Sequence, residues 1–347
     1  MNETVNIEIS QRGKQILRIV IEEHIRTGRP VGSRFVSKKL GGAISPATVR
    51  NVMQDLEEVG LLWQPHTSAG RVPTALALRY YLANMMKPKK LTLAEKKKIE
   101  QVFLNDFTDI LQLMENVGRV LAALSNEISV IVSPGGEDMI LHKIELIPIS
   151  SKNVVLVLVT RTGMTRSIVM ECSGIEPRKL EEFGQRLNER LAGLTFSEIK
   201  KTIRERIADL QRIYSSFSSK LVQSAKEIFS VEDEVTAVFG RENIIKKPEF
   251  SDQRQLSQLM SICESDELLI KCIPSDVPPG QVEIVIDSPP IEQLAMVVSS
   301  YSFGYGRGFL GVVGSRRMNY PKLVELVSYT ANRISHLLSG EEIEERG

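Results

Sequence analysis

The sequence predicts an α+β multidomain protein that begins with a winged helix-turn-helix. Two observations lead to this prediction. Residues 44–73 (ISPATVRNVMQDLEEVGLLWQPHTSAGRVP) have the pattern of a capped amphipathic helix followed by a short β-ribbon with a polar, glycine-containing tip. Further along, two groups of strand-like segments enclose a helical stretch, as in an α+β domain with an insertion.

The charge distribution agrees with a DNA-binding N-terminal part. The first 90 residues carry 14 Lys and Arg against 7 Asp and Glu, whereas the whole chain has a formal net charge of only +1. A basic module on a neutral body is typical of a nucleic-acid-binding protein. A charged surface that serves solubility is the alternative, and the motif at residues 44–73 favours the first interpretation.

Two helices are expected before this motif. Residues 11–26 place apolar side chains at helical spacing, and a second, short helix is expected from Ser33 to Leu40. Gly41 and Gly42 then supply a tight turn. This order of elements is that of a winged helix-turn-helix.

The third helix is the candidate recognition helix. Ser45 is a good N-cap, and Pro46 suits the first helical position because no N–H is needed there. One face of the helix is apolar: Val49, Val52, Met53 and Leu56. The opposite face is mainly polar: Ala47, Arg50, Asn51, Gln54 and Glu58. Arg, Asn and Gln can form bidentate bonds with base edges, although an ordinary solvated helix face has a similar composition.

A β-ribbon after this helix would form the wing. Gly60 is expected to end the helix, and residues 61–63 resemble a short strand. Gly70 is expected to adopt a positive φ at the tip, and Arg71 is expected to reach a phosphate or the minor groove. The candidate DNA-binding residues are therefore Ser45, Ala47, Thr48, Arg50, Asn51, Gln54, His66, Thr67, Ser68 and Arg71.

The rest of the chain is expected to form one α+β domain with a helical insertion, or else consecutive domains. Residues 82–90 resemble a basic linker. Strands are expected at 128–132, 141–149, 154–160, 166–171, 282–286, 295–302 and 308–314. Helices are expected at 92–125, 177–229, 231–239, 251–261 and 320–338.

No pattern predicts an enzyme, a metal site or a cofactor. Residues 306–311 match G-x-G-x-x-G, but a strand follows them instead of a helix, so we interpret these glycines as part of a β-hairpin. The four histidines are scattered, and Cys172, Cys263 and Cys272 form no ligand cluster. No signal peptide or membrane-spanning run is evident, and a cytoplasmic protein with reduced cysteines is expected.

The motif at residues 44–74 resembles the signature of HrcA-type heat-inducible transcription repressors. Residues 311–320 (GVVGSRRMNY) are similar to a second signature of that family. The chain departs from the usual pattern at Val52, at residues 75–78 and at Ser315-Arg316, and the last of these bears on the C-terminal loop. Over nearly its full length, the chain is similar to this family.

This resemblance implies three domains and a mode of action. It implies a winged-helix DNA-binding domain (1–90), a discontinuous GAF-like α+β domain (91–175 and 265–347) and an inserted, mostly helical dimerisation domain (176–264). It also implies a homodimer that represses chaperone operons by binding an inverted-repeat operator in double-stranded DNA, with the GroEL chaperonin as modulator.

The candidate dimer surface consists of apolar positions in the helical stretch: Leu194, Ile203, Ile207, Leu210, Ile213 and Leu221. Packing of these side chains within their own domain is the alternative. Two other functions also stay open at this stage. The GAF-like domain would bind a small effector in a metabolite-responsive regulator, or the loop at residues 304–311 would bind a nucleotide in an enzyme.

Overall fold

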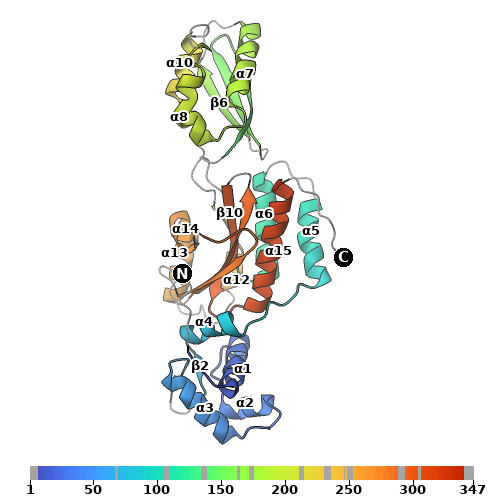
Figure 1. The fold of residues 1–347 in the computed structure, drawn as a ribbon, viewed down its shortest axis with the longest axis vertical. Helices are drawn as coiled ribbons and strands as arrows, with labels where there is room; N and C mark the ends of the chain where they lie inside the picture. The colour runs from blue at the N-terminus through green and yellow to red at the C-terminus, as the bar shows by residue number, and fades with distance from the viewer. Residues whose placement is uncertain are drawn as a thin grey trace.

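The computed structural model describes residues 7–66, 69–104, 110–133, 139–161, 165–171, 176–210, 215–229, 236–245, 247, 253–274, 276–287, 294–303 and 306–339. The protein has a mixed α+β fold with more than one packing unit, which agrees with the sequence analysis. The units follow one another along an elongated molecule, with the N-terminal elements at one end (Figure 1).

The N-terminal elements, residues 7–84, form a unit that we call the winged unit. Its elements are α1 (Gln11–Thr27), α2 (Ser33–Lys39), α3 (Pro46–Glu58), β1 (Leu62–Trp63), β2 (Val72–Pro73) and α4 (Ala75–Asn84). The apolar faces of α1 and α3 meet in a core that includes Ile16, Leu17, Val49 and Met53. The expected helices and ribbon are therefore present, and the expected linker begins only after α4.

Residues 91–132 and 236–339 form the central part of the molecule, which we call the body. Its sheet has five antiparallel strands in the order β7-β3-β10-β9-β8. The strands are β3 (Ile128–Val132), β7 (Thr236–Phe239), β8 (Val282–Ile286), β9 (Leu294–Phe303) and β10 (Gly306–Ser315). Every residue of β3 is buried, because helices cover both faces of the sheet.

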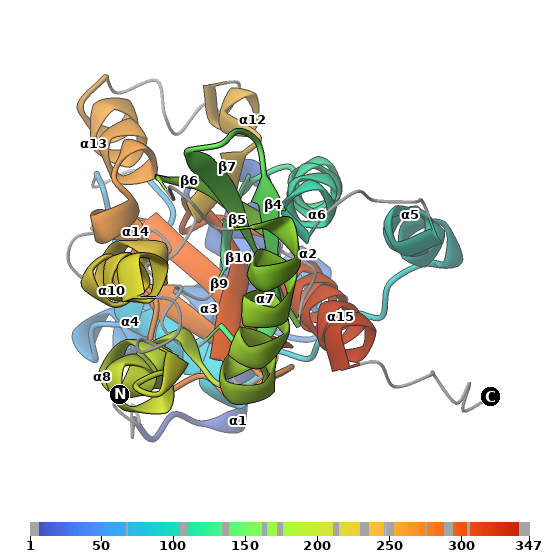
Figure 2. The ribbon, with the colours of Figure 1, turned by 90° about the horizontal axis from the view of Figure 1, so that it is seen from above.

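The helices of the body lie in two layers (Figures 1 and 2). One layer has α6 (Ile110–Ser125) and α15 (Tyr320–Ser339), with α5 (Leu93–Leu104) outside them. The other layer has α12 (Arg241–Ile245), α13 (Gln253–Glu264) and α14 (Asp266–Cys272). The expected single helix at 92–125 is thus two helices, α5 and α6.

A separate unit lies at the far end of the molecule from the winged unit (Figure 1). It has a three-stranded antiparallel sheet in the order β4-β5-β6 and its own apolar core. Its strands are β4 (Leu141–Pro148), β5 (Asn153–Thr160) and β6 (Thr165–Glu171). Its helices are α7 (Pro177–Leu191), α8 (Phe196–Arg206), α10 (Ser215–Gln223) and α11 (Ala225–Ile228).

The pairing of β3 with β7 locates this insertion. Val132, the last residue of β3, lies opposite Thr236, the first residue of β7. The chain therefore leaves the body sheet and returns to it at one point. We call residues 133–235 the inserted unit.

This topology corrects several expectations. The strands at 141–171 form a second sheet and do not extend the body sheet, because their buried side chains pack on α7 and α8. Conversely, α12, α13 and α14 pack on the body. The helix expected at 231–239 is wrong, since residues 236–239 pair with β3 as a strand. The β-branched Thr236 and Val238 suit that role.

The positions proposed as a helical dimer surface are also mostly interior. Ile203, Ile207, Leu210 and Leu221 are at most 2% exposed and belong to the core of the inserted unit. Leu194 is partly buried against the same core, and Ile213 lies outside the described residues. Packing within the unit explains these side chains.

Candidate nucleic-acid interface

The candidate recognition helix α3 begins as its sequence predicts. The Ser45 hydroxyl accepts a hydrogen bond from the Thr48 amide at 3.1 Å, and its oxygen lies 2.9 Å from the Thr48 hydroxyl oxygen. Pro46 occupies the first helical position. Gly60 follows the helix with a φ of 75°, which confirms its expected role at the C-terminal end. Both ends of α3 are therefore fixed by local contacts.

The two faces of α3 divide sharply. Val49, Met53 and Leu56 are at most 3% exposed and pack in the core. The candidate base-reading residues are exposed on the other face: Ala47, Arg50, Asn51 and Gln54. Within the described part of the chain, the side chains of Arg50, Asn51 and Gln54 have no hydrogen-bond or ion-pair partner. They are thus available for an external partner.

Charge indicates which end of α3 would face DNA. The acidic residues Asp55 and Glu58 are exposed in its second half, whereas Arg50 lies nearer the N-terminus. Phosphates would be repelled by the acidic end and attracted to the N-terminal end, where the helix dipole is positive. Recognition helices use their N-terminal residues on base edges in the same way.

The wing is a short antiparallel ribbon. Leu62 pairs with Pro73 and Trp63 with Val72. The Gln64 side-chain amide donates to the Ala69 carbonyl at 2.9 Å and closes the tip. His66 is exposed on this tip, whereas the candidates Thr67 and Ser68 lie outside the described residues.

Arg71 differs from the expectation that it reaches toward DNA. Its side chain is only 13% exposed, and its Nη2 lies 2.8 Å from Oε2 of Glu57 near the end of α3. Its backbone exchanges two hydrogen bonds of 2.9 Å with Val31. Arg71 ties the wing to α3 and to the loop between α1 and α2.

Gly70 is required for a different reason from the one expected. Its φ is not positive, so no turn conformation demands glycine there. A Cβ at this position would instead lie 2.4 Å from the Val31 carbonyl carbon. The glycine allows two backbones to approach each other at the base of the wing.

Two features of the candidate interface were not predicted from the sequence. Arg34, Lys38 and Lys39 are exposed on α2, which packs against α3. The first helix of a helix-turn-helix crosses the DNA backbone, so such cations suit phosphate contacts. Three cations in seven residues were a visible signal. The second feature is Trp63, which is 49% exposed on the ribbon.

Outside the winged unit, the described residues offer little for catalysis. No group of His, Cys, Asp and Glu among them has the arrangement of a metal site. The hairpin interpretation of residues 306–311 is confirmed, since β9 and β10 pair along their whole length. A Cβ on Gly308 would lie 2.1 Å from the Tyr301 ring, so this glycine serves packing.

The thiol of Cys272 is buried, and burial raises its pKa to about 11, so it stays protonated at neutral pH. Among the described helices, none is both long and apolar enough to cross a bilayer.

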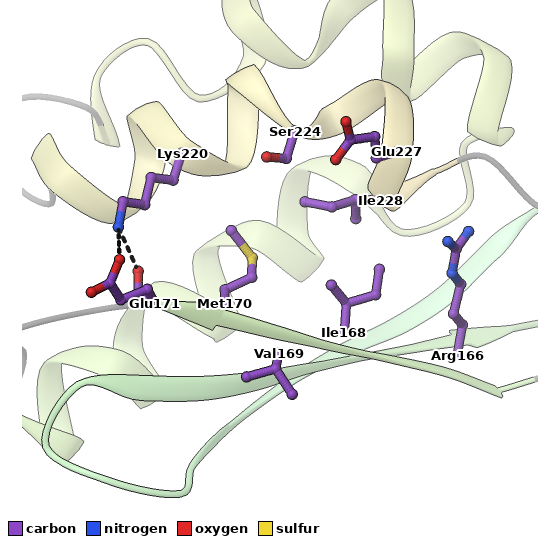
Figure 3. Close-up of a pocket in the computed structure, with 9 residues that line it drawn as sticks. All are labelled: Arg166, Ile168, Val169, Met170, Glu171, Lys220, Ser224, Glu227 and Ile228. Carbon is purple, nitrogen blue, oxygen red and sulfur yellow. Dashed lines mark hydrogen bonds and ion pairs between the residues drawn. The ribbon is translucent and has the colours of Figure 1, made fainter.

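The inserted unit has a groove of about 370 Å³ between β6 and the helices α10 and α11 (Figure 3). Ile168, Met170 and Ile228 line its middle. At one end, the Lys220 ammonium donates to the Glu171 carbonyl at 3.1 Å and to its carboxylate at 3.2 Å. Lys220 lies on α10 and covers the last carbonyl of the edge strand β6, so this contact has a structural explanation.

Comparison with known proteins identifies the chain's relatives. Residues 111–324 match the family model described as HrcA protein C terminal domain. The heat-inducible transcription repressor HrcA of Geobacter sulfurreducens is 32% identical over 342 residues, which cover 96% of this chain and 99% of the relative. The repressor of the same name from Syntrophobacter fumaroxidans is 31% identical over 340 residues, covering 95% and 98%.

One solved structure has the same overall fold. It is described as the crystal structure of a hypothetical protein at 2.2 Å resolution, and it matches with a TM-score of 0.65. The match covers 96% of this chain and 100% of the other, at 23% sequence identity. At this identity, the likeness concerns the fold alone.

Proposed function

The chain belongs to the HrcA family of heat-inducible transcription repressors, and from this premise we propose that it represses chaperone operons by binding an inverted-repeat operator as a homodimer. In this proposal the winged unit binds DNA, the body is a GAF-like domain, and the inserted unit is the dimerisation domain. The GroEL chaperonin modulates the amount of active repressor.

The observation that carries the DNA-binding proposal is the free polar face of α3. Arg50, Asn51 and Gln54 are exposed together on a helix that is anchored by its opposite face. These side chains match guanine and adenine edges in the major groove. Ser45, Thr48, His66 and the cations of α2 would contact phosphates on either side.

The dimer proposal rests on the outer face of the three-stranded sheet. Ile147, Val155 and Val169 lie side by side across β4, β5 and β6 in register. Ile147 is 45% exposed and Val169 is 64% exposed, while the buried side chains on the opposite face pack on the helices of the unit. A second copy related by a two-fold axis would cover this apolar row.

A two-fold dimer also suits the proposed operator. One recognition helix contacts too few bases to select a promoter, whereas two related helices meet two half-sites of an inverted repeat. Dimerisation at the end of the molecule distant from α3 would leave both winged units free for DNA.

We propose the role of the chaperonin from the membership of the chain in this family. A repressor near its stability limit responds strongly to folding assistance, since a change of about 1–2 kcal/mol alters its active fraction several-fold. When unfolded proteins occupy the chaperonin, less active repressor remains and chaperone genes are transcribed.

The test is DNA binding by the full chain, with and without chaperonin. Its affinity for an inverted-repeat fragment from a chaperone promoter is compared with that for a scrambled duplex at one fixed salt concentration. We expect a clear preference for the inverted repeat and a larger active fraction with chaperonin. Equal affinity for both duplexes, with folded protein, would contradict the proposal.

A metabolite-responsive regulator is not favoured. The face of the body sheet beneath α13 and α14 is filled with apolar side chains, among them Val130, Leu259, Leu269 and Met296. A small-molecule site needs several polar groups that converge on a cavity. The described interior of the body has a close-packed apolar core at this place instead.

A further inference from the structure

The apolar core of the winged unit is continuous with that of the body, and polar contacts join the two at one corner of the body. Arg317 lies in the loop between β10 and α15, and its guanidinium packs over Gly28 at the end of α1. A Cβ on Gly28 would lie 2.3 Å from Nη1 of Arg317. Gly28 also has a φ of 68°, so both its conformation and this contact require glycine.

His24 provides a second sign that Arg317 lies close to α1. Burial lowers the pKa of His24, a hydrogen bond with the Arg29 carbonyl opposes this shift, and the Arg317 cation lowers the pKa further. The end of α1 therefore faces Arg317 with a neutral imidazole, which does not repel the cation.

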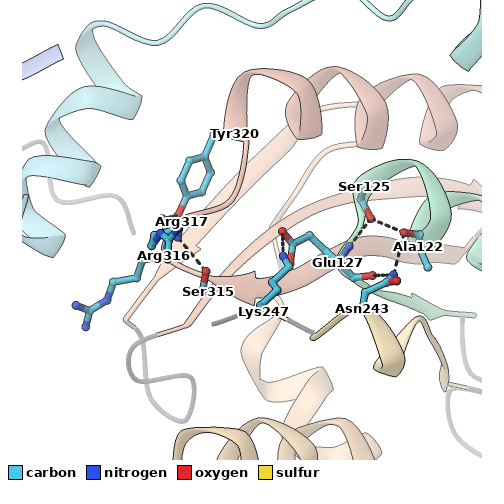
Figure 4. Close-up of polar contacts among 9 residues, drawn as sticks. All are labelled: Ala122, Ser125, Glu127, Asn243, Lys247, Ser315, Arg316, Arg317 and Tyr320. Atoms are coloured by element: carbon cyan, nitrogen blue, oxygen red, sulfur yellow. Dashed lines mark hydrogen bonds and ion pairs between the residues drawn. The ribbon is translucent and has the colours of Figure 1, made fainter. Parts of the chain in front are cut away.

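Polar contacts hold the corner that carries Arg317, and Figure 4 shows Arg316, Arg317 and Tyr320 close together there. Arg316 forms a bidentate ion pair with Asp287: its Nε lies 2.7 Å from Oδ1 and its Nη2 lies 2.5 Å from Oδ2. This pair joins the end of β10 to the end of β8. The buried Tyr320 hydroxyl donates to the Arg316 carbonyl at 2.9 Å. A fixed loop can hold Arg317 in one place.

Two more contacts lie at the same corner, one from the winged unit and one from the segment that follows α4. The Arg79 side chain on α4 donates to the Ile286 carbonyl at 2.7 Å, one residue before Asp287. The Lys89 amide donates to the Pro321 carbonyl at 2.7 Å, one residue after Tyr320. All these contacts are polar and directional, so they fix orientation as well as distance.

A short path connects this seat with the DNA-facing surface. Gly28 lies three residues before Val31, which holds Arg71 by two backbone hydrogen bonds. Arg71 in turn binds Glu57 on α3. Arg317 thus contacts the start of the loop between α1 and α2, and this loop is hydrogen-bonded to Arg71, which links the wing to α3.

We infer that Arg317 is a positioning residue for operator binding: seated on Gly28, it holds the winged unit in one orientation on the body, so that the two recognition helices of a dimer meet half-sites at one fixed spacing. This inference rests on the proposed function for its DNA-binding consequence. The orientation itself is a property of the free protein.

The free protein allows a test without DNA. The chain has a single tryptophan, Trp63, which lies on the wing and is half-exposed. Time-resolved anisotropy of its fluorescence reports whether the winged unit tumbles with the whole molecule or independently. We expect the slow component of the decay to shrink in Arg317→Ala and in Gly28→Ala, and to stay unchanged in Arg186→Ala.

Arg186→Ala is the matched control because, among the described residues, Arg186 pairs only with the exposed Glu182 on α7, far from the winged unit. Circular dichroism establishes that each variant is folded. If alanine at position 317 prevents folding, Arg317→Lys replaces it, since lysine keeps the charge but cannot lay a planar group over Gly28.

A second experiment measures affinity for DNA duplexes in which the two half-sites are moved apart by half a helical turn. We expect wild-type affinity to fall at least about tenfold after this insertion of about 5 base pairs, and that of Arg317→Ala to fall less than about threefold. Affinity for a single half-site should be equal in the two proteins.

A slow anisotropy component and a spacing preference that both survive in Arg317→Ala and Arg317→Lys would overturn the inference. Absence of operator binding by the wild type would instead count against the proposed function, and the anisotropy result would still decide the orientation.

Discussion

The Arg71 guanidinium lies 2.8 Å from the Glu57 carboxylate and links the wing to α3 by an ion pair. The arginine is 13% exposed and the glutamate 32% exposed, so water screens this ion pair only in part. The wing is therefore attached to α3 by a side chain that was expected from the sequence to contact DNA.

Replacing Arg71 should affect stability more than phosphate contacts. We expect Arg71→Ala to lower the free energy of unfolding by about 1–3 kcal/mol, because Glu57 loses its partner and the wing loses its brace. Urea unfolding of the single variants and of Arg71→Ala/Glu57→Gln measures their coupling.

The same variant distinguishes bracing from phosphate binding. DNA affinity falls with salt, and the slope of log affinity against log salt concentration becomes shallower by about one when a phosphate contact is lost. We expect this change of slope for Lys38→Ala but not for Arg71→Ala. A reduced slope for Arg71→Ala would show that its side chain moves onto DNA when DNA binds.

Asn51 should determine sequence preference. Asn51→Ala removes a side chain that can bond adenine at two atoms, so we expect it to lose about 1–3 kcal/mol of discrimination between operator and scrambled DNA. Asp55→Ala is the control on the same helix, and it should retain the preference. If Asn51→Ala weakens binding to both duplexes equally, Asn51 does not read bases.

The exposed row of the inserted unit should hold the dimer together. Val169→Asp places a charge on a side chain that is 64% exposed in the single chain and would be buried in the dimer. Sedimentation should give the dimer mass for the wild type and the monomer mass for this variant. The control Lys201→Asp changes charge on the exposed side of α8 and should remain dimeric. A dimeric Val169→Asp protein would direct attention to another surface.

Stability at acidic pH should depend on Glu95 at the start of α5. Its bonds with Lys322 and with Thr92 lower its pKa from 4.5 to about 2. Because the folded pKa is below the unfolded one, the stabilisation is complete above about pH 5 and is lost as pH falls from 4.5 toward 2. In Glu95→Gln, the unfolding free energy should vary less with pH across this window. The same pH dependence in both proteins would mean that other carboxylates dominate.

The local sequence was sufficient for the winged unit. Its helices have caps and apolar stripes that depend on neighbours three or four residues away, as Ser45, Val49 and Met53 illustrate. The exposed positions of the candidate base-reading residues followed from the same periodicity. By contrast, the ion pair of Arg71 could not be predicted, since Glu57 and Val31 approach it only in the folded chain.

The sequence did not predict which strands belong to the same sheet. The strands at 141–171 and those at 282–314 are both rich in valine and isoleucine, and the local sequence does not specify which strands pair. Only the pairing of Val132 with Thr236 separates the two sheets, and it joins positions far apart in the sequence. The strand at 236–239 is four residues long, too short for its periodicity to exclude a helix.

The return of the chain to the same point of the sheet also has a kinetic consequence. The body cannot complete its sheet until β3 finds β7 and β10, which are separated from it by residues 133–235 and more. Closing a long unstructured loop costs entropy and slows folding. An inserted unit that collapses early around its own core brings its two ends together and shortens this loop. Assembly of the DNA-binding repressor would then begin with the segment farthest from DNA.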